Sequence, residues 1–361
     1  MKLFKCTNCG NTVYFENTSC GNCGFLIGFD AEQMTLLALK QEQNGQLTAT
    51  VNNVATHYKY CANQMQNGCN WLMPENNESA FCKACDLNKV IPDLRNPEYV
   101  EAWQKIETAK RRLVYGLLRM KLPIVSKTKD EKGGLAFAFM ADTGTDEKDK
   151  VFTGHDEGLI TINVAEANDI DREMARQSMH EVYRTLLGHF RHEIGHYYWD
   201  RLIDNTPNID KCRQLFGDDR QDYEEALQKH YAQGTPPNWN NNFISPYAST
   251  HPWEDWAETW AHYMHIVDTL ETAYSFGLSV DPKIAHNDEK LSSKIKTDPY
   301  SLKDFETIIK LWLPLTFAMN SLNRSMGLQD IYPFVITNPV QEKLKFIHEV
   351  VLGNAGAKEH G

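Results

Sequence analysis

The sequence predicts an α+β fold, in which a small cysteine-rich region precedes a mainly helical domain with a small sheet. Eight of the nine cysteines lie within the first 85 residues. Beyond them, long segments place apolar residues at helical spacing, and only a few short runs resemble strands. The chain has 361 residues, enough for a small module and one large domain. We place these at residues 1–90 and 91–361.

The first cysteine group consists of two short pairs. Cys6 and Cys9, like Cys20 and Cys23, are separated by two residues, and a glycine follows each pair. A tight turn at each pair lets four thiolates complete a tetrahedral zinc site, and glycine tolerates that turn. Four unlinked thiols are the less favoured alternative. We expect a structural zinc ion that stabilises a module too small for its own core.

The second cysteine group is less regular. It contains Cys61, Cys69, Cys82 and Cys85, of which only the last two have the two-residue spacing. Four cysteines within 25 residues still favour a second zinc site over free thiols. Residues 1–90 are therefore predicted to be a zinc-ribbon region with two structural zinc ions. Cys212 is isolated, and we expect an ordinary thiol there.

The remaining elements follow from composition and spacing. Prolines mark residues 91–97 as a linker. Strands are expected at residues 46–51, 134–140 and 158–163, and helices at residues 98–120, 183–202, 303–322 and 339–352. Residues 164–203 as a whole are expected to be mostly helical, residues 204–245 to form a helix with loops, and residues 355–361 to fray.

One helix carries the pattern His192-Glu193-Ile-Gly-His196. Residues four apart share a helix face, so both histidines can bind one zinc ion. Glu193 can then hold a water molecule that zinc makes acidic. A surface helix with two scattered histidines is the alternative. Gly195 weakens it, because a metal site needs a small residue where elements pack closely.

A third zinc ligand is expected from residues 250–265. Trp253, Trp256, Trp260 and Val267 recur at helical spacing and indicate a core-facing side. A second face carries Glu254, Glu258, His262 and His265, and ionisable groups beside tryptophans are costly to bury without a purpose. Spacing alone does not choose between the two glutamates. The alternative is a solvated acidic start of a helix.

Composition limits the possible environments. Hydrophobic residues make up 42% and charged residues 24%, as in ordinary globular proteins. No apolar run has membrane-spanning length, and the N-terminus does not resemble a signal peptide. The net charge of −11 makes nonspecific nucleic-acid binding unlikely. Without a secretory signal, the cysteine pairs indicate zinc rather than disulfides, which predicts a cytoplasmic protein.

These residues resemble known zinc enzymes. The acidic helix resembles the ligand helix of the gluzincins, which implies that Glu254 binds zinc and Glu258 braces a ligand histidine. More broadly, the chain resembles a bacterial family of zinc-binding metallopeptidases with an N-terminal zinc ribbon. The matching segments are Cys61 with residues 69–72, then residues 188–200, 251–263, 266–272 and 332–334. The resemblance implies a zincin-like metallopeptidase domain.

The expected activity is zinc-dependent hydrolysis of peptide bonds in an intracellular protein or peptide. It uses one catalytic zinc ion besides the two structural ones, with Glu193 as general base. Asp200 is expected to orient a ligand imidazole, although a plain surface aspartate fits equally well. We take His262 as the oxyanion donor; His251, Tyr247 and Tyr263 are alternatives.

Substrate binding is expected along a strand. In zincin-type peptidases a strand before the active-site helix pairs with the substrate backbone, and residues 158–163 are our choice for such an edge strand. An internal core strand is the alternative.

Two other functions stay open. One is a zinc-stabilised module that binds a protein or nucleic acid without catalysis, and the other is a zinc amidase that acts on a small molecule. Glu193 argues against the first, because a structural zinc needs no base beside it. Long loops suit an extended peptide better than a small molecule. A protein partner of the zinc-ribbon region is also possible.

Overall fold

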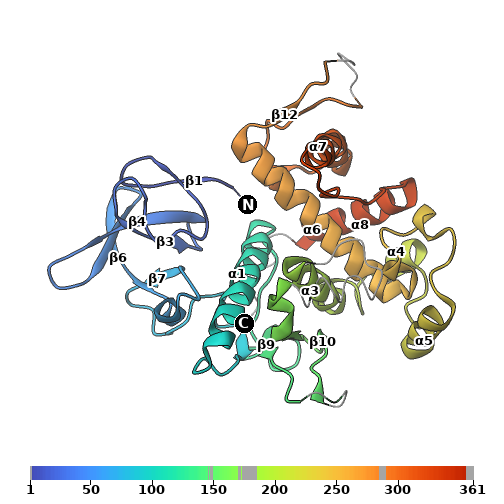
Figure 1. Ribbon diagram of the computed structural model, residues 1–361, viewed down its shortest axis with the longest axis horizontal. Helices are drawn as coiled ribbons and strands as arrows, with labels where there is room; N and C mark the ends of the chain where they lie inside the picture. Colours follow the sequence, from blue (N-terminus) through green and yellow to red (C-terminus); the bar gives the residue numbers. More distant parts are fainter. Residues whose placement is uncertain are drawn as a thin grey trace. The chain divides into compact units, whose positions relative to one another are not determined.

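A computed structural model describes residues 2–144, 146, 149–169, 172, 185–283 and 290–354. The chain forms two compact units. The first contains residues 1–118, 125–154 and 159–169, and the second contains residues 119–124, 155–158 and 170–361. The first is rich in strands and the second is mainly helical, which confirms the α+β prediction (Figure 1).

The first unit begins with the cysteine-bearing strands. β1 (Phe4–Lys5) and β2 (Thr12–Val13) form an antiparallel pair. An antiparallel sheet of five strands follows, in the order β3-β4-β5-β6-β7. Its strands are β3 (Leu26–Asp30), β4 (Thr35–Gln41), β5 (Leu47–Val51), β6 (Val54–Tyr60) and β7 (Leu72–Pro74). β5 confirms the strand predicted at residues 46–51.

A compact aromatic cluster forms part of this unit's core. Its members are Phe4, Phe15, Phe29, Trp71 and Tyr115, and the contacting rings have centroids 4.9 to 6.3 Å apart. Each of them is at most 4% exposed. Tyr115 belongs to α1 (Pro97–Arg119), the helix predicted at residues 98–120. Burial of large rings explains how short strands and a helix hold together.

A smaller sheet has the order β10-β11-β9-β8. β9 (Ala136–Met140) lies parallel to both β8 (Asn88–Val90) and β11 (Leu159–Asn163), and β10 comprises Gly154–Asp156. The predicted strands at residues 134–140 and 158–163 are confirmed.

The expected edge position of residues 158–163 is wrong. β11 lies between β9 and β10 in the sheet order, and Ile160 and Ile162 are fully buried. Glu157 and Gly158 join β10 to β11, and their positive φ values of 43° and 85° reverse the chain between these strands. β10 is therefore the neighbour of β11 in the sheet order, on the side away from β9. The three residues of β10 have no apolar alternation from which the sequence could reveal a strand.

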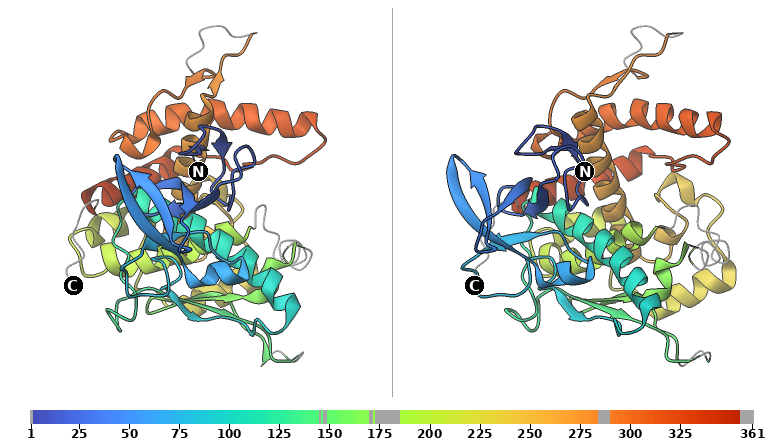
Figure 2. Two further views of the ribbon diagram at one scale, coloured as in Figure 1. Left: turned by 90° about the vertical axis from the view of Figure 1, so that its left-hand side faces the viewer. Right: turned by 60° about the vertical axis from the view of Figure 1, so that its left-hand side comes forward.

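The second unit is built on one long helix, α6 (Pro252–Phe276) (Figures 1 and 2). Four helices pack against it: α3 (Leu186–Leu202), α4 (Ile209–Phe216), α7 (Phe305–Ser325) and α8 (Asn338–Asn354). α5 (Tyr223–Gln233) and a short pair, β12 (Ser279–Val280) and β13 (Ser293–Lys294), complete the unit.

Helices α3, α7 and α8 confirm the predictions at residues 183–202, 303–322 and 339–352, apart from residues 183 and 184, which lie outside the described part. The described part also excludes residues 170–171 and 173–184, for which we predict helix, and residues 355–361, for which we predict fraying. Between 204 and 245 the helices α4 and α5 alternate with loops, as expected. No helix in the described part of the chain is long and apolar enough to cross a membrane.

Gly195 sets the separation of α3 and α6. A Cβ atom there would lie 3.0 Å from Ala257 Cα and 3.2 Å from Trp260 Cβ. The Gly195 carbonyl also accepts a hydrogen bond of 2.8 Å from Trp256 Nε1. A larger residue would force the helices apart, since protein interiors are close-packed.

Replacing Gly195 by alanine should therefore destabilise the protein. We expect Gly195→Ala to lower the unfolding free energy by about 1–3 kcal/mol through overpacking. The control is Gly353→Ala in α8, where an added Cβ meets nothing within 4 Å and the glycine is exposed. That variant should match the parent or exceed it slightly, because alanine favours a helix. Thermal unfolding of the zinc-loaded proteins measures both; equal midpoints for the two variants would contradict the packing argument.

Candidate metal centres

The facing surfaces of α3 and α6 bring three donor atoms together. His192 Nε2 lies 3.1 Å from His196 Nε2, and Glu254 Oε2 lies 3.0 Å from the first and 3.5 Å from the second. All three residues are buried. The structure therefore unites both histidines of the sequence pattern with Glu254.

The starts of both helices are fixed by side-chain caps. The Thr185 side chain accepts a hydrogen bond from the Gly188 backbone N–H at the start of α3. At the start of α6, His251 Nδ1 accepts from the Trp253 N–H, and Pro252 occupies the first turn. Caps of this kind satisfy backbone donors that a helix leaves free. They also fix where the first turn of α6 presents Glu254.

The three donors fit a zinc ion. Zinc–nitrogen and zinc–oxygen bonds of about 2.0–2.1 Å in a tetrahedron require donors about 3.3 Å apart, close to the observed separations. Glu254 Oε2 is buried and has no hydrogen bond among the described residues, so a polar atom is left for a ligand. Two imidazoles and one carboxylate are the donor set of a zinc site that keeps an open position.

Glu258 braces His192 from behind. Its Oε1 lies 2.7 Å from His192 Nδ1, and its Oε2 accepts a 2.6 Å hydrogen bond from Ser245 Oγ. Burial alone would raise the pKa of Glu258, but His192 and Ser245 lower it to about 2. An ionised Glu258 accepts a hydrogen bond from the Nδ1–H of His192, which leaves the Nε2 lone pair of His192 directed at the other donors.

The cluster has an excess of negative charge. Burial opposes a charge on His192, yet Glu254 and Glu258 raise the pKa of His192 well above its usual value. A buried carboxylate (Glu254) and a partly buried one (Glu258) around one imidazole thus favour a positive charge between them. A divalent cation supplies that charge. Glu254 Oε2 faces the Nε2 atoms of both histidines, whereas Glu258 contacts Nδ1 of His192. These contacts favour Glu254 over Glu258 as the third ligand.

Glu193 lies next to this cluster and is not engaged by it. It is 6% exposed, and its carboxylate forms no hydrogen bond or ion pair with any residue that the structure describes. It is near enough to Tyr223 that its charge, after burial and Glu254, raises the pKa of that phenol. A carboxylate without a partner beside a metal centre can accept a proton.

Aromatic side chains surround the donors. The Trp253 and His196 rings are in contact, tilted by 34° with centroids 3.7 Å apart, and the centroid of the Tyr247 ring lies 6.0 Å from that of His192. Tyr223 donates a 2.7 Å hydrogen bond to Glu254 Oε1. No sequence pattern indicates the roles of Tyr223 and Ser245 or the ring contact between Trp253 and His196. Tyr223 and Ser245 lie in a segment without any motif, and Trp253 was expected to face the core.

The structure does not support His262 as the oxyanion donor. It follows Glu254 by two turns of α6, a rise of about 12 Å. Its Nδ1 lies 2.8 Å from the Tyr332 hydroxyl, and its ring packs against Phe334 at 4.3 Å. Burial lowers the pKa of His262 to about 4 despite the nearby charge of Glu258. It belongs to an aromatic pocket along α6 rather than to the donor cluster.

The described residues do not show the expected hydrogen bond from Asp200 to a ligand imidazole. His196 Nδ1 is buried and makes no hydrogen bond among the described residues. The Asp200 carboxylate instead lies 3.8 Å from Nε2 of His155, a nitrogen that accepts from the Gly158 N–H. Asp200 is one turn beyond His196, and its half-exposed side chain points to this neighbour.

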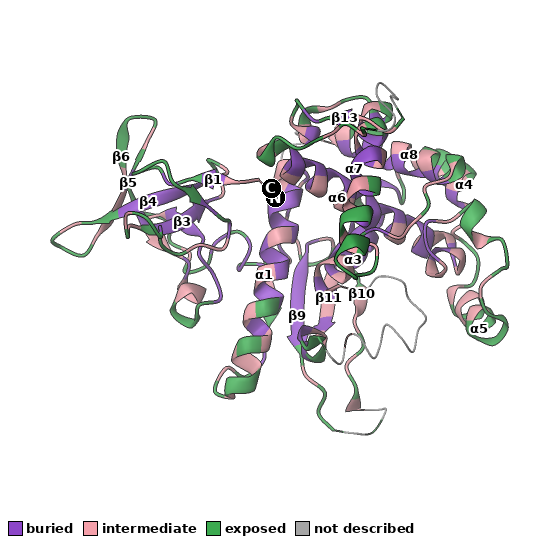
Figure 3. Ribbon diagram, turned by 45° about the horizontal axis from the view of Figure 1, so that its top comes forward, coloured by how far each residue is buried: buried purple, intermediate pink, exposed green. Residues whose placement is uncertain are grey.

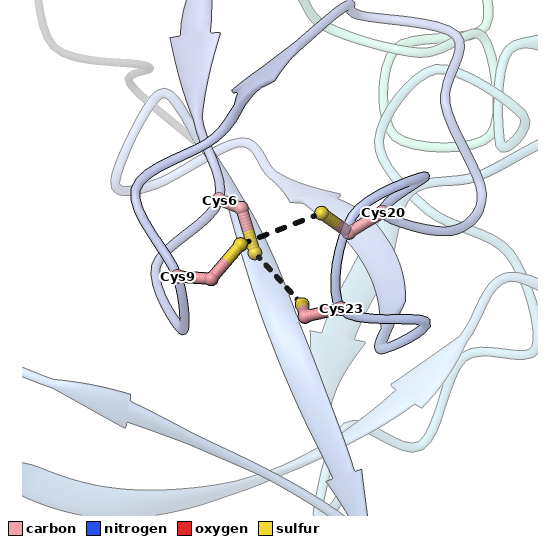
Figure 4. Close-up of side chains that lie close together, drawn as sticks. All are labelled: Cys6, Cys9, Cys20 and Cys23. Atoms are coloured by element: carbon pink, nitrogen blue, oxygen red, sulfur yellow. Dashed lines mark hydrogen bonds between the residues drawn. The ribbon is translucent and has the colours of Figure 1, made fainter.

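The first four-cysteine cluster has the dimensions of a zinc site. Figure 4 shows Cys6 facing Cys23 and Cys9 facing Cys20, and both sulfur pairs are 3.7 Å apart. Zinc–sulfur bonds of about 2.3 Å in a tetrahedron require sulfurs about 3.8 Å apart. Cys9 is exposed, so this cluster lies at the surface of its unit.

The second four-cysteine cluster is fully buried. Cys61, Cys69, Cys82 and Cys85 group together, with Cys69 and Cys82 sulfurs 3.7 Å apart. Cys85 Sγ lies 3.7 Å from Glu107 of α1, which forms a buried ion pair of 2.9 Å with Lys110. Lys110 places a positive charge near thiolates that would otherwise be costly to bury. Cys212, as expected, is a lone thiol and is buried in α4.

Comparisons with known proteins agree with this geometry. A family model described as "Putative zinc-binding metallo-peptidase" matches residues 99–350, and a zinc-ribbon domain model matches residues 3–96. Uncharacterized proteins of Mycobacterium tuberculosis and Mycobacterium bovis are each 42% identical to the chain over 352 residues. These alignments cover 97% of this chain and 95% of each relative. No solved structure matches the chain.

The three clusters predict three zinc ions per chain. Glu254→Ala should lose one of them, because it removes a ligand atom, and Cys82→Ser should lose a different one. Glu258→Ala should lower occupancy less, since Glu258 only braces a ligand. Elemental analysis of the purified proteins gives the counts. The assignment is incorrect if Glu258→Ala loses a zinc ion that Glu254→Ala retains.

Proposed function

This chain belongs to the zinc-binding metallopeptidase family, and we propose that it hydrolyses peptide bonds of a protein or peptide. Membership confirms the family resemblance seen in the sequence. The proposed centre uses His192, His196 and Glu254 as zinc ligands and Glu193 as general base. The observation that carries this proposal is that a buried Glu254 oxygen without a hydrogen bond converges with the Nε2 atoms of His192 and His196, and that the Glu193 carboxylate lies beside them.

Zinc, when bound, supplies a Lewis acid that polarises a carbonyl group and acidifies water. The chain's own residues perform the remaining work. Glu193 accepts a proton from the attacking water and then delivers it to the leaving amine. Glu258 keeps His192 in the tautomer whose Nε2 is free to bind.

Tyr247 replaces His262 as the proposed oxyanion donor. Its ring lies 6.0 Å from that of His192, beside the donor cluster. Burial raises the pKa of Tyr247, and the charge of Glu254 raises it further, so its hydroxyl stays protonated. A protonated phenol is a hydrogen-bond donor suited to a developing negative charge.

The family supports peptide bonds over a small-molecule amide as the substrate. The two four-cysteine clusters, which we propose as structural zinc sites, also support a reducing compartment, and we propose the cytoplasm. The zinc-ribbon region, residues 3–96, is a separate candidate for binding a protein partner.

Replacement of the proposed base tests the mechanism. Glu193→Gln keeps the size and polarity of the side chain but cannot accept the proton. We expect it to retain all three zinc ions and the parent melting temperature, and to lose about 10²–10⁴-fold in peptide hydrolysis. Cleavage of a peptide library, followed by mass spectrometry, measures the rate for both proteins.

Two outcomes would reject the proposal. A Glu193→Gln variant that cleaves as fast as the parent would remove Glu193 from the chemistry. A zinc-loaded parent that cleaves no peptide in a broad library would favour a zinc-stabilised binding protein.

A further inference from the structure

We propose that Tyr223 positions Glu254 for metal binding and so couples occupancy of the metal centre to docking of α5. This inference rests on the proposed zinc centre and adds a residue from outside the sequence motifs. It begins from the two oxygens of the Glu254 carboxylate, which have different environments.

One oxygen of the Glu254 carboxylate accepts a hydrogen bond, and the other does not. Oε1 accepts a 2.7 Å hydrogen bond from the Tyr223 hydroxyl, whereas Oε2 faces the Nε2 atoms of His192 and His196. Oε2 has no hydrogen bond among the described residues. A carboxylate with both oxygens free can rotate or bind through either of them. The phenol removes that freedom and presents a single oxygen to the metal.

Tyr223 is also the first residue of α5, and its surroundings belong to the start of α6. Its ring packs edge-on against His251 at 5.4 Å and against Trp253 at 5.7 Å. Two residues earlier, the Gln221 carbonyl accepts a 3.2 Å hydrogen bond from His251 Nε2. The N-terminal end of α5 is therefore attached to the same turn that carries the third ligand.

The rest of α5 is weakly held. All eleven of its residues are described and none is buried, as Figure 3 shows by its green and pink colours. A helix of this length is only marginally stable without tertiary contacts. Its order consequently depends on a few anchoring contacts, one of which is the part-buried hydrogen bond from Tyr223 to the proposed ligand Glu254.

Docking of Tyr223 and binding of the metal must then be linked. If docked Tyr223 favours binding of the metal, bound metal favours docking of Tyr223 by the same factor. Loss of a hydrogen bond to a ligand residue typically weakens metal binding by about 10–100-fold. A tyrosine that only packs against α6 would show no such link, and phenylalanine would replace it fully.

Zinc affinity separates these two roles. Tyr223→Phe keeps the ring and its packing but removes the hydroxyl. In the full-length protein, titration with a zinc chelator should displace one of three zinc ions about 10–100-fold more readily than in the parent. The other two should be unchanged. The matched control is Tyr231→Phe, which removes the hydroxyl of a 68% exposed tyrosine on the same helix and should behave as the parent.

Amide hydrogen exchange tests the link from the other side. The parent is compared with all three zinc ions and at a chelator concentration that leaves two. Exchange in α5 should accelerate when the third ion leaves, while exchange in α7 should not change. In Tyr223→Phe, α5 should exchange fast in both states.

The inference is overturned if Tyr223→Phe binds all three zinc ions as tightly as the Tyr231→Phe control. It is also overturned if exchange in α5 of the parent is the same with and without the third ion. If the parent binds three zinc ions and cleaves peptides under these outcomes, only the role of Tyr223 fails. If the parent binds only two, the proposed zinc centre fails with it.

Discussion

The close approach of α3 and α6 at Gly195 is the constraint on which the rest of the second unit depends. A Cβ atom at residue 195 would lie only 3.0 Å from Ala257 and 3.2 Å from Trp260, so a larger residue would have to push the two helices apart by a few tenths of an ångström. The same crossing carries His192 and His196 on one helix and Glu254 on the other. A shift of about 1 Å between the helices would separate donors that a metal ion needs within bonding reach. Packing and metal binding are thus two consequences of one contact.

Charge gives the second constraint. Neighbouring groups lower the pKa values of the buried Glu254 and the partly buried Glu258, and both carboxylates contact His192. Leaving such charges unpaired would be strongly unfavourable, and a cation between the donors removes the penalty. The two four-cysteine clusters pose the same problem with thiolates. In the buried one, Lys110 contributes to the solution from α1. The molecule as a whole is organised around negative donor groups that require positive ions.

Patterns within single elements could be predicted from the sequence, and contacts between elements could not. His192 and His196 share a helix face by spacing alone, and α1, α7 and α8 follow from apolar periodicity. Tyr223 and Ser245 reach the site only because loops bring them there, and no spacing rule relates them to α6. The same limit explains the wrong edge position of β11 and the lack of structural support for His262 as oxyanion donor. The turn before β11 and the aromatic residues around His262 set the environment of each.

The most direct measurement of the central claim is anomalous diffraction at the zinc absorption edge from crystals of the full-length protein. We expect three zinc peaks, one of them bonded to His192 Nε2, His196 Nε2 and Glu254 Oε2 with a fourth position left open. Zinc at the two cysteine clusters alone would contradict it. So would a peak bonded to Glu258 in place of Glu254.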